Sequence, residues 1–489
     1  MRLKRRKILY GLTTIVGLFS FKNSIQRVQA QSSPIVGSNK NLLATGTLNS
    51  LPDNTTYPEI IEYSLDGKSQ LQQSSAQKVV LDNLSLASNN NREQIYQAFL
   101  KAAAGGKENQ PVLMYQGINT SPYSKQINDY PTRLMQRPDG KNLVSGNPVN
   151  ATFSPYPALG EIPRINEQGL SFIHPDIKEA CVCVGSFDKT GKFLTKWLGR
   201  NALACDEFWS STKIIALLNL VSRANRRNPT VDFDSYSIRG IDTSGNKNTF
   251  RFQDLARDIV SYEKKIATSN SLGAMFKRFS LPLDLEKWLK FVTGNQDLIF
   301  RGRYGEKSFI EQPELVDTTT KKVILNADQQ LPRWQCNAVS AYDLTRLVSM
   351  LGWHNYIPRQ SRLPDAEWKS LKTVITAMGA DPARLTDLAI QVLGLQNDIE
   401  SVAIISKLGN GNTATRERTE AVYVALVHFV DSRPKALGKP AKLFTFTMAL
   451  RGGKALQPRD PNQEVVELDA RMATEVTEIV RRVVELELG

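Results

Sequence analysis

Two polar residues near the middle of the chain have the types and the spacing of a nucleophile and its base. Ser210 lies in the run FWSSTKIIALL, and Lys213 follows three residues later, where an apolar helix is predicted to begin. Residues three apart on a helix lie on one face, one turn from each other. The lysine amine can then take the hydroxyl proton, and the helix N-terminus favours negative charge nearby. The spacing indicates acyl transfer through a serine.

The Ser-x-x-Lys spacing alone is not specific, because it also begins at Ser75, Ser186, Ser244, Ser261 and Ser432. Context distinguishes Ser210, which has a predicted hairpin and loop before it and a strongly apolar helix after it. The few histidines, His174, His354 and His428, lie in no motif, which disfavours a Ser-His-Asp triad. His428 falls in the middle of a predicted strand, where we expect a structural role.

Two further motifs follow in order along the chain. The first, ATSNSLGAMF, contains Thr268 and Asn270, and the second, IISKLGNG, contains Lys407 and Gly409 at the end of a predicted strand. Together with FWSSTK they resemble the S-x-x-K, S-x-N and K-T-G signature of class A β-lactamases and penicillin-binding proteins. The run QCNAVSAYDLTRLV resembles the segment after the active-site loop of that family. The resemblance covers roughly residues 176–489.

The resemblance implies a role for each matched residue. Ser210 would attack the substrate carbonyl, with Lys213 as general base or proton relay. Asn270 would hold the substrate amide and orient Lys213, and Lys407 would attract the substrate carboxylate. The backbone N–H groups of Ser210 and Asn410 would form the oxyanion hole, in which one donor is typically worth about 3 kcal/mol. Lys407, Gly409 and Asn410 are the expected substrate-binding residues.

The second and third motifs depart from the family pattern. In the register that keeps Asn270, Thr268 replaces the usual serine, and its branched Cβ crowds the path of the proton. The shifted register begins at Ser269 and places Ser271 where the amide should be. In the third motif Leu408 replaces threonine, which removes a hydroxyl expected to bind the substrate carboxylate.

A third departure concerns deacylation. The run Gln312-Pro-Glu-Leu resembles the active-site loop, where the family has glutamate in the first position. Glutamate activates the water that releases the acyl group, whereas an amide is not a useful base. Glu311 and Glu314 are close by in the sequence, so the deacylating carboxylate stays unassigned.

The elements around the motifs predict an α+β fold of the β-lactamase-like type. An antiparallel sheet is built from the N-terminal and C-terminal segments of the domain, with a helical subdomain between them. A hairpin turn is expected at residues 188–192 and a series of helices between about 252 and 395. The other expected elements are strands at 180–187, 193–199, 399–409, 419–431 and 441–453, and a final amphipathic helix at 465–486.

The N-terminal part predicts export to the periplasm or the extracellular space. Residues 1–30 read as a signal peptide, with a basic start, an apolar run of fourteen residues and Val28-Gln29-Ala30 as a cleavage site. The run is shorter than the roughly 20 residues of a membrane span, but an uncleaved N-terminal membrane anchor stays open. Residues 31–165 are polar and form an extension of unknown function with a helix at 92–104, and the hydrolase domain is expected at 166–489.

Charge and composition limit the kinds of partner and cofactor that we expect this chain to bind. The net charge is +14, and seven basic residues lie in the first thirty residues. The remaining Lys and Arg residues are mixed with Asp and Glu along the chain, which argues against nucleic-acid binding. Four cysteines allow at most two disulfides, and Cys181 and Cys183 are expected to be buried apolar residues. No metal or organic cofactor is expected, and we expect a monomer.

Three functions remain open. The first is a serine hydrolase related to class A β-lactamases, which hydrolyses β-lactam amides. The second is a D-alanyl-D-alanine cell-wall peptidase or penicillin-binding protein, whose substrate is a peptidoglycan peptide. The third is a degenerate domain that binds peptidoglycan or a protein partner without turnover, which Thr268, Leu408 and Gln312 favour.

Overall fold

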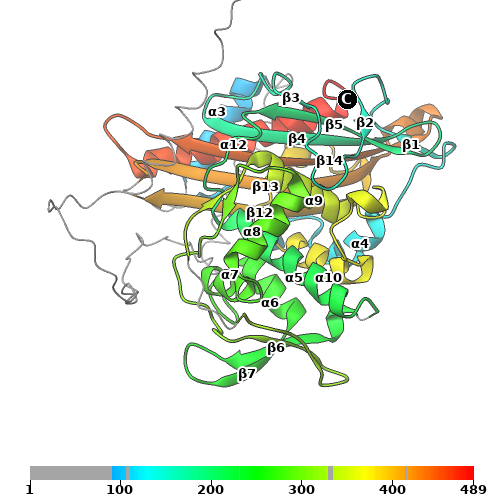
Figure 1. The fold of residues 1–489 in the computed structure, drawn as a ribbon. Coiled ribbons are helices and arrows are strands. Elements are labelled where there is room, and N and C mark those ends of the chain that lie inside the picture. Colours follow the sequence, from blue (N-terminus) through cyan, green and yellow to red (C-terminus); the bar gives the residue numbers. More distant parts are fainter. Residues whose placement is uncertain (1–90, 106–110, 231, 329–333, 414–415) are drawn as a thin grey trace, which may run out of the picture. The chain divides into compact units, whose positions relative to one another are not determined.

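The computed structural model describes residues 91–105, 111–230, 232–328, 334–413 and 416–489, which belong to one compact unit (Figure 1). The predicted signal peptide and residues 31–90 of the predicted extension lie outside the described residues. Among the described residues, no helix has both the length and the apolar character that a membrane span requires.

The largest element is a sheet of long strands from both ends of the domain. Its main path runs β12-β13-β14-β4-β5-β2, so that β12 forms one edge. The strands β12 to β5 along this path pair antiparallel, and residues 188–192 form the turn between β4 and β5. The bounds are β12 (Ile399–Thr413), β13 (Arg418–Asp431), β14 (Ala441–Lys454), β4 (Ile177–Phe187), β5 (Phe193–Arg200) and β2 (Ser154–Pro155).

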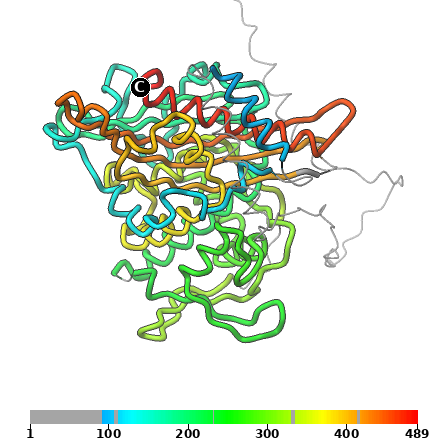
Figure 2. Tube along the Cα trace, turned by 180° about the vertical axis from the view of Figure 1, so that it is seen from behind, coloured from blue at the N-terminus to red at the C-terminus, as the bar shows by residue number. Residues whose placement is uncertain are grey.

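Helices cover both faces of this sheet, which explains why its central strands are almost continuously apolar. On one face lies α9 (Ala341–Gly352), and on the other lies α12 (Pro461–Val484). The helix α3 (Arg92–Ala103) packs along α12, as the blue and red helices of Figure 2 show. His428 of β13 is fully buried, and burial lowers its pKa to about 3, which fits the predicted structural role.

The helical subdomain follows β5 in the chain and lies on one side of the large sheet (Figure 1). It carries a small sheet with the order β10-β9-β6-β7 and a pair formed by β11 and β8. Its helices are α5 (Lys213–Arg227), α6 (Phe252–Ser261), α7 (Ser269–Lys277), α8 (Pro282–Thr293) and α10 (Trp368–Gly379), whereas α11 (Leu385–Val392) packs against α12. Its strands are β6 (Tyr236–Ile241), β7 (Lys247–Arg251), β8 (Ile299–Phe300), β9 (Glu314–Asp317), β10 (Val323–Asn326) and β11 (Asn337–Ala338).

The residues before 166 are part of the same unit, which corrects the predicted domain boundary. The strand β1 (Leu143–Ser145) pairs in parallel with β14, and β3 (Ile165–Asn166) pairs in parallel with β5. These segments and the short helix α4 (Tyr130–Arg133) contribute too few residues to produce a periodic pattern. Sequence reasoning therefore read this region as an extension, although its apolar side chains, such as Tyr130 and Leu134, are fully buried.

The predicted fold class is confirmed: the chain is α+β, with an antiparallel sheet made by both ends of the domain and helices between them. The predicted helix at 92–104 is confirmed as α3. All four cysteines are free thiols; Cys181 and Cys183 are buried on β4, as expected, and Cys205 and Cys336 are partly buried.

Candidate active site

Ser210 lies at the junction between the large sheet and the helical subdomain. It belongs to the 3₁₀ helix η3 (Trp209–Thr212), which leads directly into α5, whose first residue is Lys213. Lys213 is fully buried, whereas 8% of the Ser210 surface is exposed. The chain order therefore places a nearly buried serine one turn before a fully buried amine.

The end of β12 touches the backbone of η3. A Cβ atom added to Gly409 would lie 3.1 Å from Ser210 N and 2.8 Å from Phe208 O. Only a residue without a side chain permits so close an approach of two backbones. The contact places the residue after Gly409, Asn410, close to Ser210, and the oxyanion hole formed by the N–H groups of Ser210 and Asn410 stays a prediction.

Ser269 supplies the hydroxyl that faces the lysine. Lys213 Nζ donates a hydrogen bond of 2.8 Å to Ser269 Oγ, which in turn donates to Ile259 O at 2.7 Å. The predicted register, which gave this role to Thr268, is therefore corrected by one residue. Thr268 is the N-cap of α7: its hydroxyl accepts from Ser271 N at 3.1 Å and donates to the carboxylate of Glu306.

The one-residue shift changes the position predicted to hold the substrate amide. Asn270 is buried in the first turn of α7, and successive helical residues point about 100° apart, so it faces another direction than Ser269. Ser271 is in the next position, and its hydroxyl donates to Lys307 O at 2.9 Å. The role of Asn270 toward the substrate stays a prediction.

A loop from residue 301 to 309 crosses the start of α7. Phe309 N donates to Ser271 O at 3.1 Å, and the phenol of Tyr304 lies 3.2 Å from Thr212 Oγ1. The ring of Tyr304 is centred 5.3 Å from Lys213 Nζ, and Glu306 contacts Thr268. Sequence reasoning missed this loop, because Glu306 stands in no motif of the resemblance.

Gln312 does not lie in that loop, and its predicted place in the active-site loop needs correction. Gln312 is exposed, and its carbonyl oxygen packs against Gly240 of β6 in the small sheet. Its acidic neighbours face arginines: Glu314 lies 2.6 Å from Arg239, and Glu311 lies 3.5 Å from Arg278. Ile310 forms an isolated bridge with Asp242, directly after β6, so this segment lies against the small sheet, which only the tertiary structure reveals.

Lys407, predicted to attract the substrate carboxylate, is fully buried. Its ammonium donates to the hydroxyl of Tyr262 and to Leu408 O at 3.2 Å. Burial raises the pKa of the nearby Asp381 to about 6, although the positive charge of Lys407 opposes the change. Leu408 is also fully buried, so neither residue presents a polar side chain to solvent.

Tyr262 is a second residue that sequence reasoning missed. Its ring centre lies 5.6 Å from Lys213 Nζ and 3.9 Å from Lys407 Nζ, so the same aromatic ring lies within cation–π range of both amines. Its hydroxyl donates to Leu408 O at 3.2 Å. Tyr262 ends α6 in the left-handed conformation, with φ of 59°. No pattern in the sequence signals a tyrosine at this position.

Trp209 precedes Ser210 and has a strained backbone. Its φ is 48°, a genuine outlier for a bulky residue. The indole Nε1 donates to Glu420 Oε2 at 3.0 Å, and the six-membered ring fills the space beside Gly411, where a Cβ would lie 2.1 Å from it. The side chain is therefore fixed at both ends of the indole.

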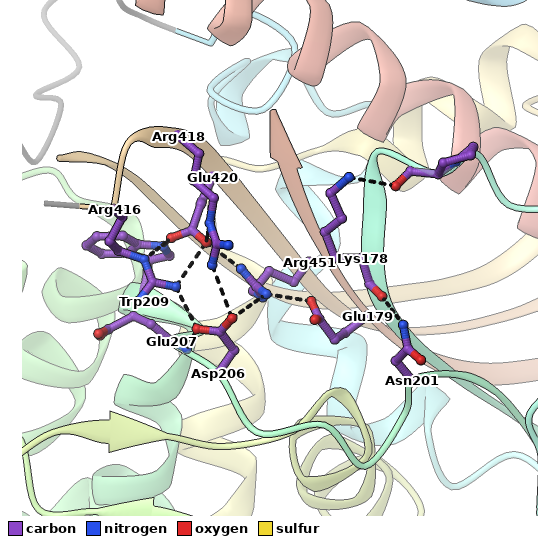
Figure 3. Close-up of polar contacts among 11 residues, drawn as sticks. Lys178, Glu179, Asn201, Asp206, Glu207, Trp209, Arg416, Arg418, Glu420 and Arg451 are labelled. Atoms are coloured by element: carbon purple, nitrogen blue, oxygen red, sulfur yellow. Dashed lines mark hydrogen bonds and ion pairs between the residues drawn. The ribbon is translucent and has the colours of Figure 1, made fainter. Parts of the chain in front are cut away.

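Glu420 belongs to a cluster of alternating charges under the site (Figure 3). Arg451 lies at its centre, 2.6 Å from Asp206 and 2.7 Å from Glu179, and it also contacts Glu420. Two further arginines of the β12–β13 connection join the cluster through Asp206 and Glu420, namely Arg416 and Arg418. The cluster ties three strands to the loop that leads into η3.

Glu207 follows Asp206 of this cluster in the chain, and its side chain points away from Arg451 (Figure 3). Burial raises the pKa of Glu207 to about 7, and the charge of Arg416 opposes the change. Burial also lowers the pKa of Lys277 well below its usual value. Lys277 Nζ donates to Asn337 Oδ1 at 2.9 Å, next to the ring of Tyr304. A second buried amine thus lies near the ring of Tyr304, as Lys213 does.

In the part of the chain that the structure describes, no group of three or more His, Cys, Asp or Glu side chains is placed to hold a metal ion. The residues gathered around Ser210 are instead hydroxyls, amines and phenols. Such groups transfer protons and donate hydrogen bonds, and this chemistry suits acyl transfer.

The chain matches no protein-family model and no curated protein. Among solved structures it is similar to the crystal structure of a peptidoglycan synthetase from Bifidobacterium adolescentis, with 11% sequence identity and a TM-score of 0.28. The similarity covers 65% of this chain and 60% of that one, so this chain matches less than two thirds of the other protein.

Proposed function

We propose that the chain is a serine hydrolase of the β-lactamase and penicillin-binding-protein type, which forms an acyl-enzyme at Ser210. The observation that carries the proposal is the buried hydrogen bond of 2.8 Å between Lys213 Nζ and Ser269 Oγ, one turn after Ser210. Burying an amine is costly unless it has partners, and here its partner is a hydroxyl that can relay a proton.

In the proposed reaction Lys213 accepts the hydroxyl proton of Ser210 while Oγ attacks the substrate carbonyl carbon. The carbonyl oxygen becomes an oxyanion, which the N–H groups of Ser210 and Asn410 stabilise. Ser269 then passes a proton from Lys213 to the departing nitrogen, and the carbon–nitrogen bond breaks. The acyl group stays on Ser210 until water hydrolyses the ester, which releases the acid and restores the hydroxyl.

Deacylation needs a base for the water, and we assign this role to Glu306. The 301–309 loop brings its carboxylate onto Thr268, directly before Ser269. Glu306→Gln should therefore leave the acylation rate within about threefold of the native value and slow deacylation by ~10²–10⁴, the range for a lost general base. Equal deacylation rates in the two proteins would contradict the assignment.

The substrates we propose are β-lactam amides, with a peptidoglycan peptide as the alternative, in an exported protein. The burial of Lys407 and Leu408 favours a second candidate, a degenerate domain that binds peptidoglycan or a protein partner without turnover. A substrate carboxylate at this strand end would need partners that these two buried side chains do not present to solvent.

Covalent labelling tests the proposal. Mass spectrometry after prolonged incubation with benzylpenicillin, and separately with a fluorophosphonate, should find one adduct on the peptide that contains Ser210. Ser210→Ala should abolish both adducts. Ser244→Ala is a matched control, because Ser244 also begins a Ser-x-x-Lys run but is exposed on the surface. Labelling that survives in Ser210→Ala would refute the nucleophile, and a chain that reacts with neither probe would favour the degenerate domain.

A further inference from the structure

Residues Pro111–Ile118, here named the strap, come from the region before the predicted hydrolase domain and reach the candidate active site. The side chains of Leu113 and Met114 are fully buried, and Tyr115 is nearly so. A segment that buries so much apolar surface is part of the folded unit rather than a loose connection. The strap is therefore packed into the folded unit, and it reaches the candidate site through the hydrogen bond of Tyr115 to Asn410.

Backbone hydrogen bonds hold the strap on both sides of Tyr115. The carboxylate of Asp469, buried in α12, accepts from Leu113 N at 2.6 Å and from Met114 N at 2.9 Å. On the other side Gly117 N donates to Pro382 O at 3.0 Å. Gly117 has φ of 80°, a conformation that favours glycine. These hydrogen bonds fix the backbone on both sides of Tyr115, and with it the position of the Tyr115 side chain beside β12.

Tyr115 contacts the same strand end as the nucleophile. Its hydroxyl donates to Asn410 Oδ1 at 2.8 Å, and its ring packs edge-on against Tyr262 with the centroids 6.1 Å apart. Asn410 follows Gly409, which lies against Ser210, and the ring of Tyr262 contacts both Lys213 and Lys407. Tyr115 thus contacts the side chain of Asn410, whose backbone N–H is a proposed oxyanion donor.

The position that Tyr115 occupies has a chemical consequence for substrates. β12 is the edge strand, and an extended acyl donor can add to such an edge through backbone hydrogen bonds. Side chains alternate along a strand, so Leu408 and Asn410 lie on one face. On that face the Asn410 amide oxygen already accepts from Tyr115, and Leu408 is buried. A substrate carboxylate that entered beside this face would lose its hydration, and neither Leu408 nor Asn410 would give it a cation in return.

We propose that the strap is an internal competitor of the substrate, and that Tyr115 is the residue that determines selectivity between acyl donors with and without a carboxylate at the β12 end. This inference rests on the proposed acyl-enzyme at Ser210. It assigns to the strap a role that the hydrolase motifs do not include. With Tyr115 in place, a donor whose carboxylate is masked should react faster than the same donor with the free acid.

The experiment compares nitrocefin with its methyl ester, which differ only in that carboxylate. Tyr115→Phe should raise the acylation rate with nitrocefin roughly fivefold, the factor expected for the loss of one hydrogen bond, and Tyr115→Ala by more. The rate with the ester should change less than twofold in both variants. Asp469→Asn is a second variant that weakens the strap anchor without changing Tyr115, and it should shift the selectivity in the same direction.

The outcomes separate the two proposals. Equal acceleration of acid and ester would mean that Tyr115 only narrows the access path, and slower reaction with both would make it part of the substrate-binding wall. Either result would overturn the proposed selectivity. Fluorophosphonate labelling of Ser210 in the native chain and in each variant shows that the nucleophile is intact. If this label is absent from the native chain, the proposed function itself fails.

Discussion

Replacing Trp209 by phenylalanine should disturb Ser210, the proposed nucleophile, without removing any group that takes part in the proposed chemistry. The indole N–H donates to the buried carboxylate of Glu420 at 3.0 Å, and a hydrogen bond to a charged group is worth about 1.5–3 kcal/mol. The left-handed φ of 48° at Trp209 costs about 1–3 kcal/mol. Because the two energies are similar, loss of the bond should let the backbone relax before Ser210.

Relaxation would move the N–H of Ser210 away from the proposed oxyanion position, beside Gly409. Loss of one such donor costs about 2.7–4 kcal/mol, so acylation in Trp209→Phe should slow by ~10²-fold or more if the displacement is complete. Stopped-flow acylation with a fluorophosphonate measures the rate, and saturation kinetics separates it from binding. The dissociation constant of the noncovalent complex should change little.

Glu420→Gln is the matched control, because a glutamine oxygen can still accept the indole N–H. This variant loses the charge that faces Arg451, Arg416 and Arg418, and breaking a buried ion pair typically costs about 3–5 kcal/mol of stability. We expect a lower melting temperature but a nearly native acylation rate in the folded protein. If Trp209→Phe acylates within threefold of the native rate, Trp209 does not position Ser210 and the reasoning is refuted.

Three further predictions concern the site and the strap. Ser269→Ala should slow acylation by ~10²–10⁴, because the proposed proton relay is lost. Thr268→Ala should remove only an N-cap and lower the free energy of unfolding by about 1 kcal/mol, measured with denaturant. Similar acylation rates in the two variants would restore the original register. Gln312→Glu should leave deacylation unchanged within twofold, and a faster rate would show that this segment reaches the acyl group. Burial raises the pKa of Asp469 from 3.8 to about 7, so the folded state holds the proton more tightly and stability falls as pH rises between these values. At about 1.4 kcal/mol per pH unit, the free energy of unfolding should fall by about 4 kcal/mol over this range. The fall should be absent in Asp469→Asn, and an equal fall in the native protein and this variant would contradict the prediction.

The sequence determined the features that depend on neighbouring residues. Two short runs rich in apolar residues, on either side of a turn-forming run, predicted β4, β5 and the turn between them, and the apolar periodicity predicted α3. Ser210 and Lys213 are three residues apart on one helical turn, so their proximity follows from local geometry alone. The α+β arrangement followed from the order of these elements, because strands from both ends of a domain must pair to bury their apolar faces.

Only the tertiary structure decided which distant side chains meet. A shift of one residue turns a helical side chain by about 100°, so the contact of Lys213 with Ser269 rather than Thr268 depends on how α5 and α7 pack. The position of Glu306 depends on a loop whose path is set by packing against α7. The position of Tyr115 depends on hydrogen bonds between the strap and Asp469, which belongs to the C-terminal helix α12. Contacts across hundreds of residues leave no local period in a sequence, because burial and hydrogen-bond partners select them after the elements have formed.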